Sequence, residues 1–263
     1  NGEVTEYTDP YAFANVTKPE DYKAFLAGEE KNAAHIFGAH ERTVNGVKGV
    51  LFNVWAPKAL SVSVVGEFNK YDGRVHLMER IEDTGVFELF IPGLAAGCGY
   101  MYEIKRQGKG TTRKLDPVSR QISSVPIIAS VVSDENMPDS YAWNDGLWMI
   151  KRKKEAGKKK PVTVYEVSLT DWLKEKSADE LVDFVKQEGY THVCFLPVAE
   201  YLNEEMNGYS TLGYFAVTHR IGGSDAFKKL VDDCHNAGIG VIIDWNGAYF
   251  GTEAKGLYDF DGA

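Results

Sequence analysis

The chain has 263 residues, of which 44% are hydrophobic and 25% charged, and its formal net charge is −9 at pH 7. This length and composition predict a folded globular protein with one large domain or two smaller ones. The acidic balance argues against a general binder of nucleic acids or anionic membranes, because such a surface repels phosphate groups. A neutral partner fits the charge better.

The three cysteines, Cys98, Cys194 and Cys234, are odd in number and widely spaced. They therefore predict neither a disulfide framework nor a zinc site, and we expect a cytoplasmic location. The polar residues 1–10 do not look like a signal peptide, and no apolar run approaches the roughly 20 residues of a membrane-spanning helix. Histidine spacing and the absence of nucleotide-binding glycine motifs predict no metal and no cofactor.

Residues 1–48 mix polar and aromatic side chains, and a proline at position 19 marks the start of one short helix. Over residues 49–133, apolar residues alternate with others, and clusters of Gly, Pro, Asn and Asp separate the alternating runs. This pattern predicts an antiparallel, immunoglobulin-like β-sandwich. Residues 134–160 are expected to form a linker. Its basic run, 151–160, is more typical of a solvated linker than of a nucleic-acid arm, since no aromatic residues interleave.

After residue 161 the apolar pattern alternates between strand and helix. Such an order predicts an incomplete α/β domain with a parallel sheet over residues 161–263. Adjacent carboxylates, such as Asp232-Asp233, are expected to face solvent. The expected elements are a strand at 162–169, a helix at 178–187, a strand at 192–198, a long loop at 199–223, a helix capped by Ser224 and ending at Gly238, and a strand at 240–245.

The last of these strands ends in Asp244. In α/β folds the loops that follow the carboxyl ends of buried parallel strands carry the chemistry, so Asp244 is a candidate site residue. From this stretch alone, an aspartate that caps the turn is an equally good interpretation.

Two groups of motifs then occur in a specific order and spacing. Together they resemble the glycan-binding β-sandwich and the first strands of the catalytic (β/α) barrel, or TIM barrel, of a glycogen (1,4-α-glucan) branching enzyme of the α-amylase superfamily. The resemblance covers nearly the whole chain and about two and a half βα units. The motifs are Gly38-Ala39-His40, residues 52–57, 64–69, 72–73 and 88–94, and then Tyr165-Glu166-Val167, Leu196-Pro197-Val198, Gly208-Tyr209, residues 213–216 and 237–242, and Asp244-Trp245.

The resemblance implies transfer of an α-1,4-glucan segment to a 6-hydroxyl, a step of glycogen biosynthesis that uses a carboxylate nucleophile and a carboxylic acid/base. The implied partner is an α-glucan: glycogen, starch or a maltooligosaccharide. In the family the two catalytic carboxylates lie on later barrel strands, so we expect this chain to be inactive alone. A non-catalytic α-glucan-binding or regulatory module and a protein-interaction scaffold are the alternatives.

The resemblance also assigns site residues. Asp244 matches an acid that holds the geometry of the sugar pocket, and Tyr209 matches a tyrosine that lines a sugar subsite. Tyr249 stands where the family has a histidine, and Asn207 and Asn246-Gly247 are further departures, so the sugar pocket is degenerate. Two aromatic residues beside it, Tyr214 and Trp245, are further glucan-binding candidates.

On the sandwich, Tyr71 stands where such modules carry a tryptophan that stacks on glucose, and a tyrosine can still stack. Packing over a turn is an equally good interpretation of Tyr71. Met101 replaces a lysine that binds a glucan hydroxyl. Trp55 is a third candidate, although its position between apolar residues of a strand is more typical of core packing.

A few parallel strands of an eight-stranded barrel leave an apolar edge and an apolar face open. We therefore expect this half-barrel either to pack on the sandwich or to self-associate with a second copy.

Overall fold

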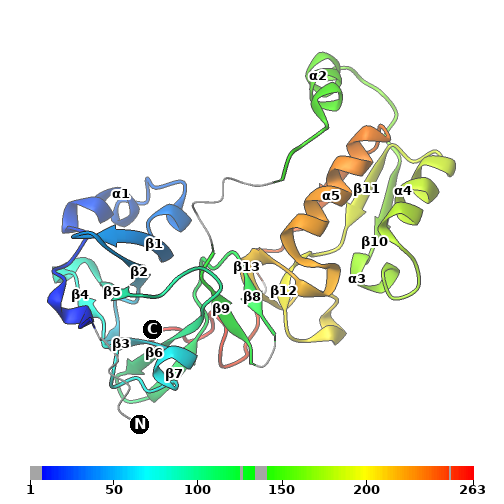
Figure 1. Ribbon diagram of the computed structural model, residues 1–263. Helices are drawn as coiled ribbons and strands as arrows, with labels where there is room; N and C mark the ends of the chain where they lie inside the picture. The colour runs from blue at the N-terminus through cyan, green and yellow to red at the C-terminus, as the bar shows by residue number, and fades with distance from the viewer. Residues whose placement is uncertain (1–7, 125–126, 134–140, 249) are drawn as a thin grey trace, which may run out of the picture. The chain divides into compact units, whose positions relative to one another are not determined.

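The computed structural model describes residues 8–124, 127–133, 141–248 and 250–263, which leaves Tyr249 outside the described residues. The chain forms two compact units (Figure 1): the first comprises Asn1–Met137 and Thr252–Ala263, and the second comprises Pro138–Gly251. The first is an antiparallel β-sandwich and the second contains a parallel sheet. The predicted fold class is therefore confirmed.

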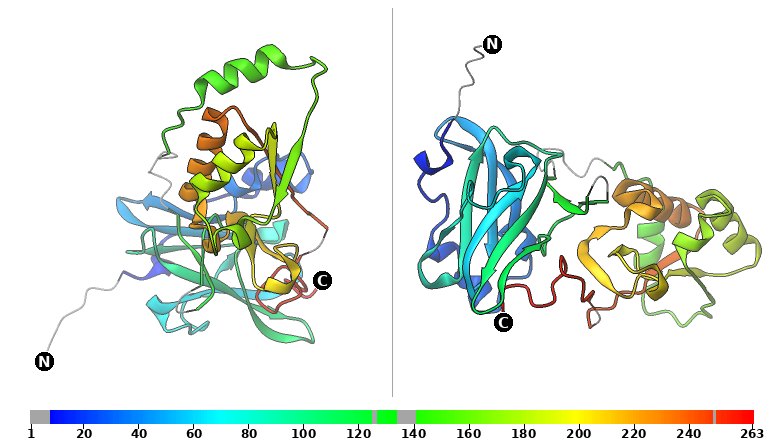
Figure 2. Two further views of the ribbon diagram at one scale, coloured as in Figure 1. Left: turned by 90° about the vertical axis from the view of Figure 1, so that its right-hand side faces the viewer. Right: turned by 90° about the horizontal axis from the view of Figure 1, so that it is seen from below.

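Two antiparallel sheets form the sandwich, whose strands lie in two layers in Figure 2. One sheet has the order β1 (Gly38–Val44), β2 (Val47–Trp55), β5 (Val86–Pro92), β4 (Glu79–Arg80). The other has the order β3 (Ala59–Gly66), β6 (Gly99–Arg106), β9 (Ala129–Val131), β8 (Ile122–Ser123), and β7 (Gly110–Lys114) also pairs with β6.

The first strand of the sandwich lies ahead of the predicted start at residue 49. Asn45 and Gly46 both have positive φ angles, 50° and 81°, and join β1 to β2 through a two-residue turn. An Asn-Gly pair is the residue choice that such hairpins favour, because both turn positions require a left-handed backbone. This hairpin signal moves the start of the sandwich to Gly38.

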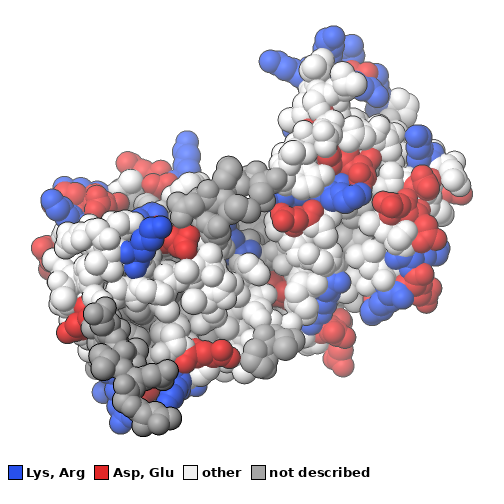
Figure 3. Space-filling model, viewed as in Figure 1, with Lys and Arg blue, Asp and Glu red and all other residues white. Residues whose placement is uncertain are grey.

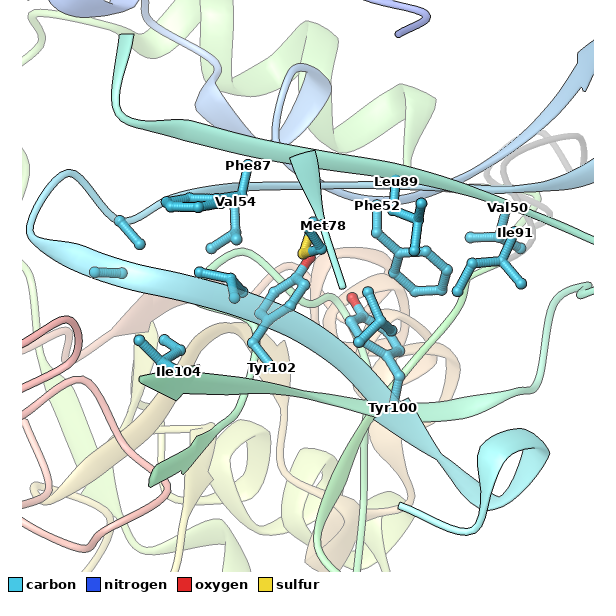
Figure 4. Close-up of a cluster of buried hydrophobic side chains, with 14 of the residues drawn as sticks. Val50, Phe52, Val54, Met78, Phe87, Leu89, Ile91, Tyr100, Tyr102 and Ile104 are labelled. Carbon is cyan, nitrogen blue, oxygen red and sulfur yellow. The ribbon is translucent and has the colours of Figure 1, made fainter. Parts of the chain in front are cut away.

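The core lies between the two sheets. Figure 4 shows side chains of β2 and β5 pointing toward those of β6. Asp116 accepts a hydrogen bond from the buried hydroxyl of Tyr100 at 2.5 Å. Burial raises the pKa values of Tyr100 and Tyr102 well above the usual range, so both are neutral hydrogen-bond donors. The core residues include Val50, Phe52, Val54, Phe87, Leu89, Ile91 and Ile104.

The N-terminal segment covers the outer face of β2 and β5. Its short helix, predicted from the proline, is present as η2 (Pro19–Tyr22) continued by α1 (Lys23–Leu26). Buried Glu88 accepts hydrogen bonds from the backbone N–H of Val16 at 2.6 Å and from Asn53 at 2.7 Å. The other short helices of this unit are η1 (Pro10–Ala12), η3 (Ala33–His35), η4 (Glu67–Asn69) and η5 (Glu82–Thr84).

Trp55 is not a core residue, so the expected core packing is wrong. It is 44% exposed and its ring meets Phe25 edge-on at 5.4 Å between centroids. The reason is strand parity: Val54 faces the inter-sheet core, and the next residue of a strand points to the opposite face.

Residues 252–263 also belong to the first unit, although the sequence placed them in the α/β domain. Leu115 donates its N–H to the carbonyl of Lys255 at 2.9 Å, and Lys114 donates to the carbonyl of Tyr258 at 2.6 Å. Arg106 forms an ion pair with Asp259 at 2.7 Å. A polar segment without regular structure is thus held by charge and backbone contacts that no local pattern reveals.

The second unit has the parallel sheet β10 (Val164–Val167), β11 (His192–Phe195), β14 (Gly240–Ile243), and each strand is shorter than predicted. Helix α4 (Ala178–Gln187) has the predicted bounds and begins at a Ser177–Glu180 capping box. Helix α5 (Gly223–Asn236) begins one residue before the predicted cap, Ser224, because Gly222 takes the N-cap position. Apolar residues of α4 and α5 pack with buried residues of β11, and α3 (Leu169–Trp172) adds to the same cluster.

The expected loop at 199–223 contains an antiparallel hairpin, β12 (Ala199–Tyr201) with β13 (Thr211–Val217), and two short helices, η6 (Glu204–Met206) and η7 (His219–Ile221). Buried Glu200 forms an ion pair with Arg220 at 2.9 Å and accepts a hydrogen bond from Thr218 at 3.1 Å. The interpretation as a loop was wrong because a buried charge interrupts the apolar alternation of this hairpin.

Most of the predicted linker belongs to the second unit, where α2 (Gly146–Glu155) carries the gathering of Lys and Arg seen in Figure 3. Lysine and arginine favour helices. Two contacts with His235 also hold this segment in place. Asp145 Oδ2 lies 2.7 Å from His235 Nδ1, and the ring of Trp148 stacks on the imidazole with centroids 4.9 Å apart.

Asp232 is buried rather than solvent-facing. It accepts hydrogen bonds from the Tyr141 hydroxyl and the Asn144 N–H, both at 3.0 Å. Those donors come from a distant part of the chain, so the expectation of a solvated carboxylate was wrong.

None of the helices within the described residues has the length and apolar character of a membrane span.

Candidate functional site

The carboxyl edge of the parallel sheet brings together two predicted residues. Asp244 follows β14, and Tyr209 lies in the connection between β12 and β13. The Tyr209 hydroxyl donates a hydrogen bond to Asp244 Oδ2 at 2.5 Å. That bond, together with desolvation, raises the pKa of Tyr209 to about 12. Tyr209 is therefore a neutral donor near pH 7, and it holds the Asp244 carboxylate in one orientation.

The backbone ahead of Tyr209 requires a glycine. Gly208 has a φ of 86°, and a Cβ at this position would lie 2.7 Å from the carbonyl oxygen of Pro197. Any other residue would be strained in this conformation and would clash with the backbone. The N–H of Tyr209 donates to the carbonyl of Met206 at 2.8 Å, which closes the turn. These constraints aim the tyrosine ring at the end of β14.

A second carboxylate lies on the same face of the sheet. The strand register places Glu166, Cys194 and Ile242 side by side across β10, β11 and β14, and Asp244 follows Ile242 by two positions. Burial, Glu166 and Asp244 raise the pKa of the Cys194 thiol. Glu166 was not among the predicted site residues. The two-residue period of the parallel strands is the signal that would have grouped it with Asp244.

Two aromatic candidates share a pocket on this unit. The rings of Tyr214 and Trp245 meet edge-to-face with centroids 5.7 Å apart. Both line a pocket of about 180 Å³ together with Ile243 and Asp244. The Trp245 side chain is 64% exposed. The structure thus places three of the predicted residues, Tyr214, Asp244 and Trp245, around one opening beside the Tyr209–Asp244 pair.

On the sandwich, Tyr71 follows η4 with a left-handed φ of 58°. The guanidinium of Arg113 lies 5.8 Å from the centre of the tyrosine ring and donates to the Tyr71 carbonyl at 2.9 Å. Arg113 also forms an ion pair with Glu103 at 3.0 Å. These contacts fix the tyrosine backbone and place a cation against its ring.

A pocket of about 620 Å³ is lined by Tyr71 and Phe68, with polar groups from Glu67, Gln121 and Ser123. This volume lies within the roughly 300–1,000 Å³ of small-molecule sites. Met101 is buried and offers no polar group. Trp55 does not line this pocket, so the structure separates two residues that the sequence grouped as glucan-binding candidates.

Metal ligands do not gather in this protein as far as the structure describes it: no three His, Cys, Asp or Glu side chains in the described ranges are placed to hold an ion.

Residues 36–119 match the family model of carbohydrate-binding module 48, the isoamylase N-terminal domain. The chain is 41% identical over 271 residues to the 1,4-alpha-glucan branching enzyme GlgB of Methylococcus capsulatus, which covers 99% of the chain and 36% of that enzyme. The GlgB of Nitrosococcus oceani is 41% identical over 265 residues, covering 97% of the chain and 35% of the enzyme. The chain thus spans about a third of the length of the curated relatives it matches.

Solved structures show the same fold. A Salmonella typhimurium protein described as an alpha amylase aligns with a TM-score of 0.60 at 24% identity, covering 83% of the chain and 34% of that structure. The catalytic module of the pneumococcal glycogen-degrading factor SpuA aligns with a TM-score of 0.54 at 22% identity, covering 80% of the chain and 37% of that module.

Proposed function

We propose that this chain, which belongs to the 1,4-α-glucan branching enzymes of the α-amylase superfamily and corresponds to their N-terminal part, binds an α-1,4-glucan on its sandwich beside Tyr71. The observation that supports the proposal is the pocket of about 620 Å³ with Tyr71 in its wall. Most of the lining falls inside the stretch that matches the carbohydrate-binding module.

The chemistry of the pocket fits a neutral sugar. An aromatic ring offers its face to the apolar C–H surface of a glucose, and Tyr71 can do so with its backbone held by Arg113. Glu67, Gln121 and Ser123 provide polar groups for hydroxyls at the same pocket. A negatively charged chain has no charge penalty with such a ligand.

Calorimetric titration with maltoheptaose tests the proposal. We expect Tyr71→Ala to weaken binding about tenfold, the equivalent of ~1.4 kcal/mol. Trp55→Ala is the matched control, since Trp55 is an exposed aromatic residue outside the pocket. Equal affinities for the wild type and Tyr71→Ala would place the glucan elsewhere, and no binding by the wild type would favour a protein-interaction scaffold.

For the second unit, we propose that Tyr209 and Asp244 form part of a sugar subsite and that Trp245 and Tyr214 flank it. The whole protein would transfer glucan segments in glycogen biosynthesis. The chain alone would not, because Asp244, the carboxylate of this subsite, is already paired with Tyr209, whereas retaining transfer needs two carboxylates flanking one bond. A time-dependent change in the iodine-staining spectrum of amylose would overturn this proposal.

A non-catalytic α-glucan-binding module is the second candidate function. It is favoured by Asn207 and Asn246-Gly247, which depart from the residues that the family resemblance leads us to expect in the sugar pocket.

Two further properties complete the proposal. The protein would be cytosolic, which the free thiols of Cys98, Cys194 and Cys234 support. The open face of the parallel sheet would self-associate with a second copy, since Val164 and Ile242 are exposed on it.

A further inference from the structure

A second pocket, of about 340 Å³, lies on the sandwich and shares one wall with the Tyr71 pocket. Phe68 is part of both linings. The remaining lining of the second pocket is mostly apolar and includes Pro92 and Leu94, and its ionisable groups are Lys48 and His76.

The His76 ring is held in one orientation by a chain of hydrogen bonds. The Asn69 side-chain oxygen accepts the N–H of Gly66 at 3.0 Å, which fixes the orientation of the amide, because a backbone N–H can only donate. The Asn69 amide nitrogen then donates to the Val64 carbonyl at 2.8 Å and to His76 Nδ1 at 2.9 Å. Since Nδ1 accepts, the proton of the neutral imidazole is on Nε2.

The Nε2–H group of His76 is a hydrogen-bond donor without a partner in the described part of the chain. His76 is only 5% exposed. Burial lowers the pKa of His76, so the ring is neutral near pH 7. Nε2 is not among the buried side-chain atoms that lack a partner, so it keeps some exposure and can donate to a ligand or to water in the pocket that His76 lines.

We propose that this pocket is a second glucose subsite, which lets the sandwich hold a longer α-glucan across Phe68. His76 Nε2–H donates to a sugar hydroxyl, and Phe68 contributes an aromatic surface to the sugars on either side of it. The ring of Phe68 lies 5.6 Å from that of His76, so one sugar unit can contact both. A neutral donor in an apolar wall suits a neutral hydroxylated ligand, whereas the only cationic group of the lining, Lys48, is exposed at the rim.

The inference rests on the proposed glucan binding and extends it to ligand length. Maltose fits the Tyr71 pocket alone, whereas maltoheptaose reaches both pockets. We therefore expect His76→Phe, which keeps a ring but removes the donor, to weaken maltoheptaose binding about tenfold and to leave maltose binding unchanged. Titration calorimetry with both sugars measures the two affinities.

His76→Phe also removes the acceptor of Asn69, so a second variant protects the test against misfolding. Lys48→Trp places a large ring at the exposed rim and is expected to give the same selective loss. Lys105→Trp is its matched control: Lys105 is an exposed strand residue that lines neither pocket, and this variant should bind both sugars like the wild type.

The outcomes separate the two proposals. Unchanged maltoheptaose affinity in both His76→Phe and Lys48→Trp would overturn the second subsite, while a loss in Tyr71→Ala would still support the first. Loss of both sugars in His76→Phe and in Lys48→Trp, with no effect of Tyr71→Ala, would make the His76 pocket the main site and would contradict the function proposed for Tyr71. A wild type that binds neither sugar would overturn both.

Discussion

The two units bury their sheets differently. In the sandwich, the inner faces of both sheets pack on each other, and the N-terminal segment covers part of the outer face as well. In the second unit, α4 and α5 cover one face of the parallel sheet, while Val164 and Ile242 on the other face are 43% and 40% exposed. Parallel sheets are normally buried on both faces. Similar apolar strands therefore form a closed core in one unit and leave an open face in the other.

Removing a side chain from the closed core should have the largest effect. Phe52 is fully buried between the sheets, so Phe52→Ala should lower the free energy of unfolding of the sandwich by about 3–5 kcal/mol. Phe215→Ala removes a ring that is 52% exposed in the second unit and should cost less than about 1 kcal/mol. Urea unfolding combined with hydrogen exchange assigns each loss to its unit, and equal losses would contradict the contrast between the units.

A charge on the open face should have an intermediate effect. If that face self-associates, Ile242→Lys should raise the dissociation constant of the dimer at least tenfold, because the lysine ammonium resists removal from water. Leu147→Lys is the matched control on α2, where the leucine is 84% exposed. Light scattering over a concentration series measures both. A wild type that is monomeric throughout would remove self-association as the cover of this face.

The smallest effect concerns the hydrogen bond at the sheet edge. Because Asp244 is the main cause of the raised pKa of Tyr209, Asp244→Asn should lower that pKa from about 12 toward the ordinary value near 10. Absorbance at 295 nm during alkaline titration measures it, with Tyr209→Phe in each background as the control. An unchanged titration would mean that Asp244 does not orient Tyr209.

The raised pKa of Tyr209 also makes the stability of the protein depend on pH. The folded state holds the Tyr209 proton more tightly than the unfolded state, so this contribution to stability is complete below the unfolded tyrosine pKa near 10. It is lost as the pH rises toward the folded value of about 12. The wild type should therefore lose more stability than Asp244→Asn over this interval, which thermal unfolding at graded alkaline pH can measure.

Period-two alternation and turn residues were sufficient to predict the sandwich. The apolar faces of α4 and α5 were sufficient to predict the parallel sheet. The prediction for Asp232 failed because it depended on contacts with residues distant in the sequence. Asp232 is buried because Tyr141 and Asn144 satisfy its carboxylate, and no local pattern announces that pairing. The β1–β2 hairpin, by contrast, had a local signal in Asn45-Gly46 that went unused.

The residues of the candidate site also differ in whether a local sequence pattern reveals them. Asp244 followed from a strand ending in a carboxylate, but its partner Tyr209 lies 35 residues earlier and was named only through family resemblance. Trp55 was misplaced because neighbouring apolar residues conceal which side of the strand faces the core. The donor of His76 was invisible in the sequence, since its availability depends on how Asn69 uses its own amide.

The return of residues 252–263 to the sandwich makes the second unit an insertion within the first. The polypeptide leaves the sandwich once and re-enters it, so the insert is tethered at both ends. A single proteolytic cut within the insert would leave every sandwich segment in place, joined through two stubs. A chain that ends at residue 251, in contrast, would lose the Tyr258 carbonyl that accepts a hydrogen bond from Lys114. It would also lose the Asp259 carboxylate that pairs with Arg106. Deletion of the insert, with a short linker that joins the first sandwich segment directly to residues 252–263, is thus the way to isolate the sandwich with the contacts of Lys114 and Arg106 kept.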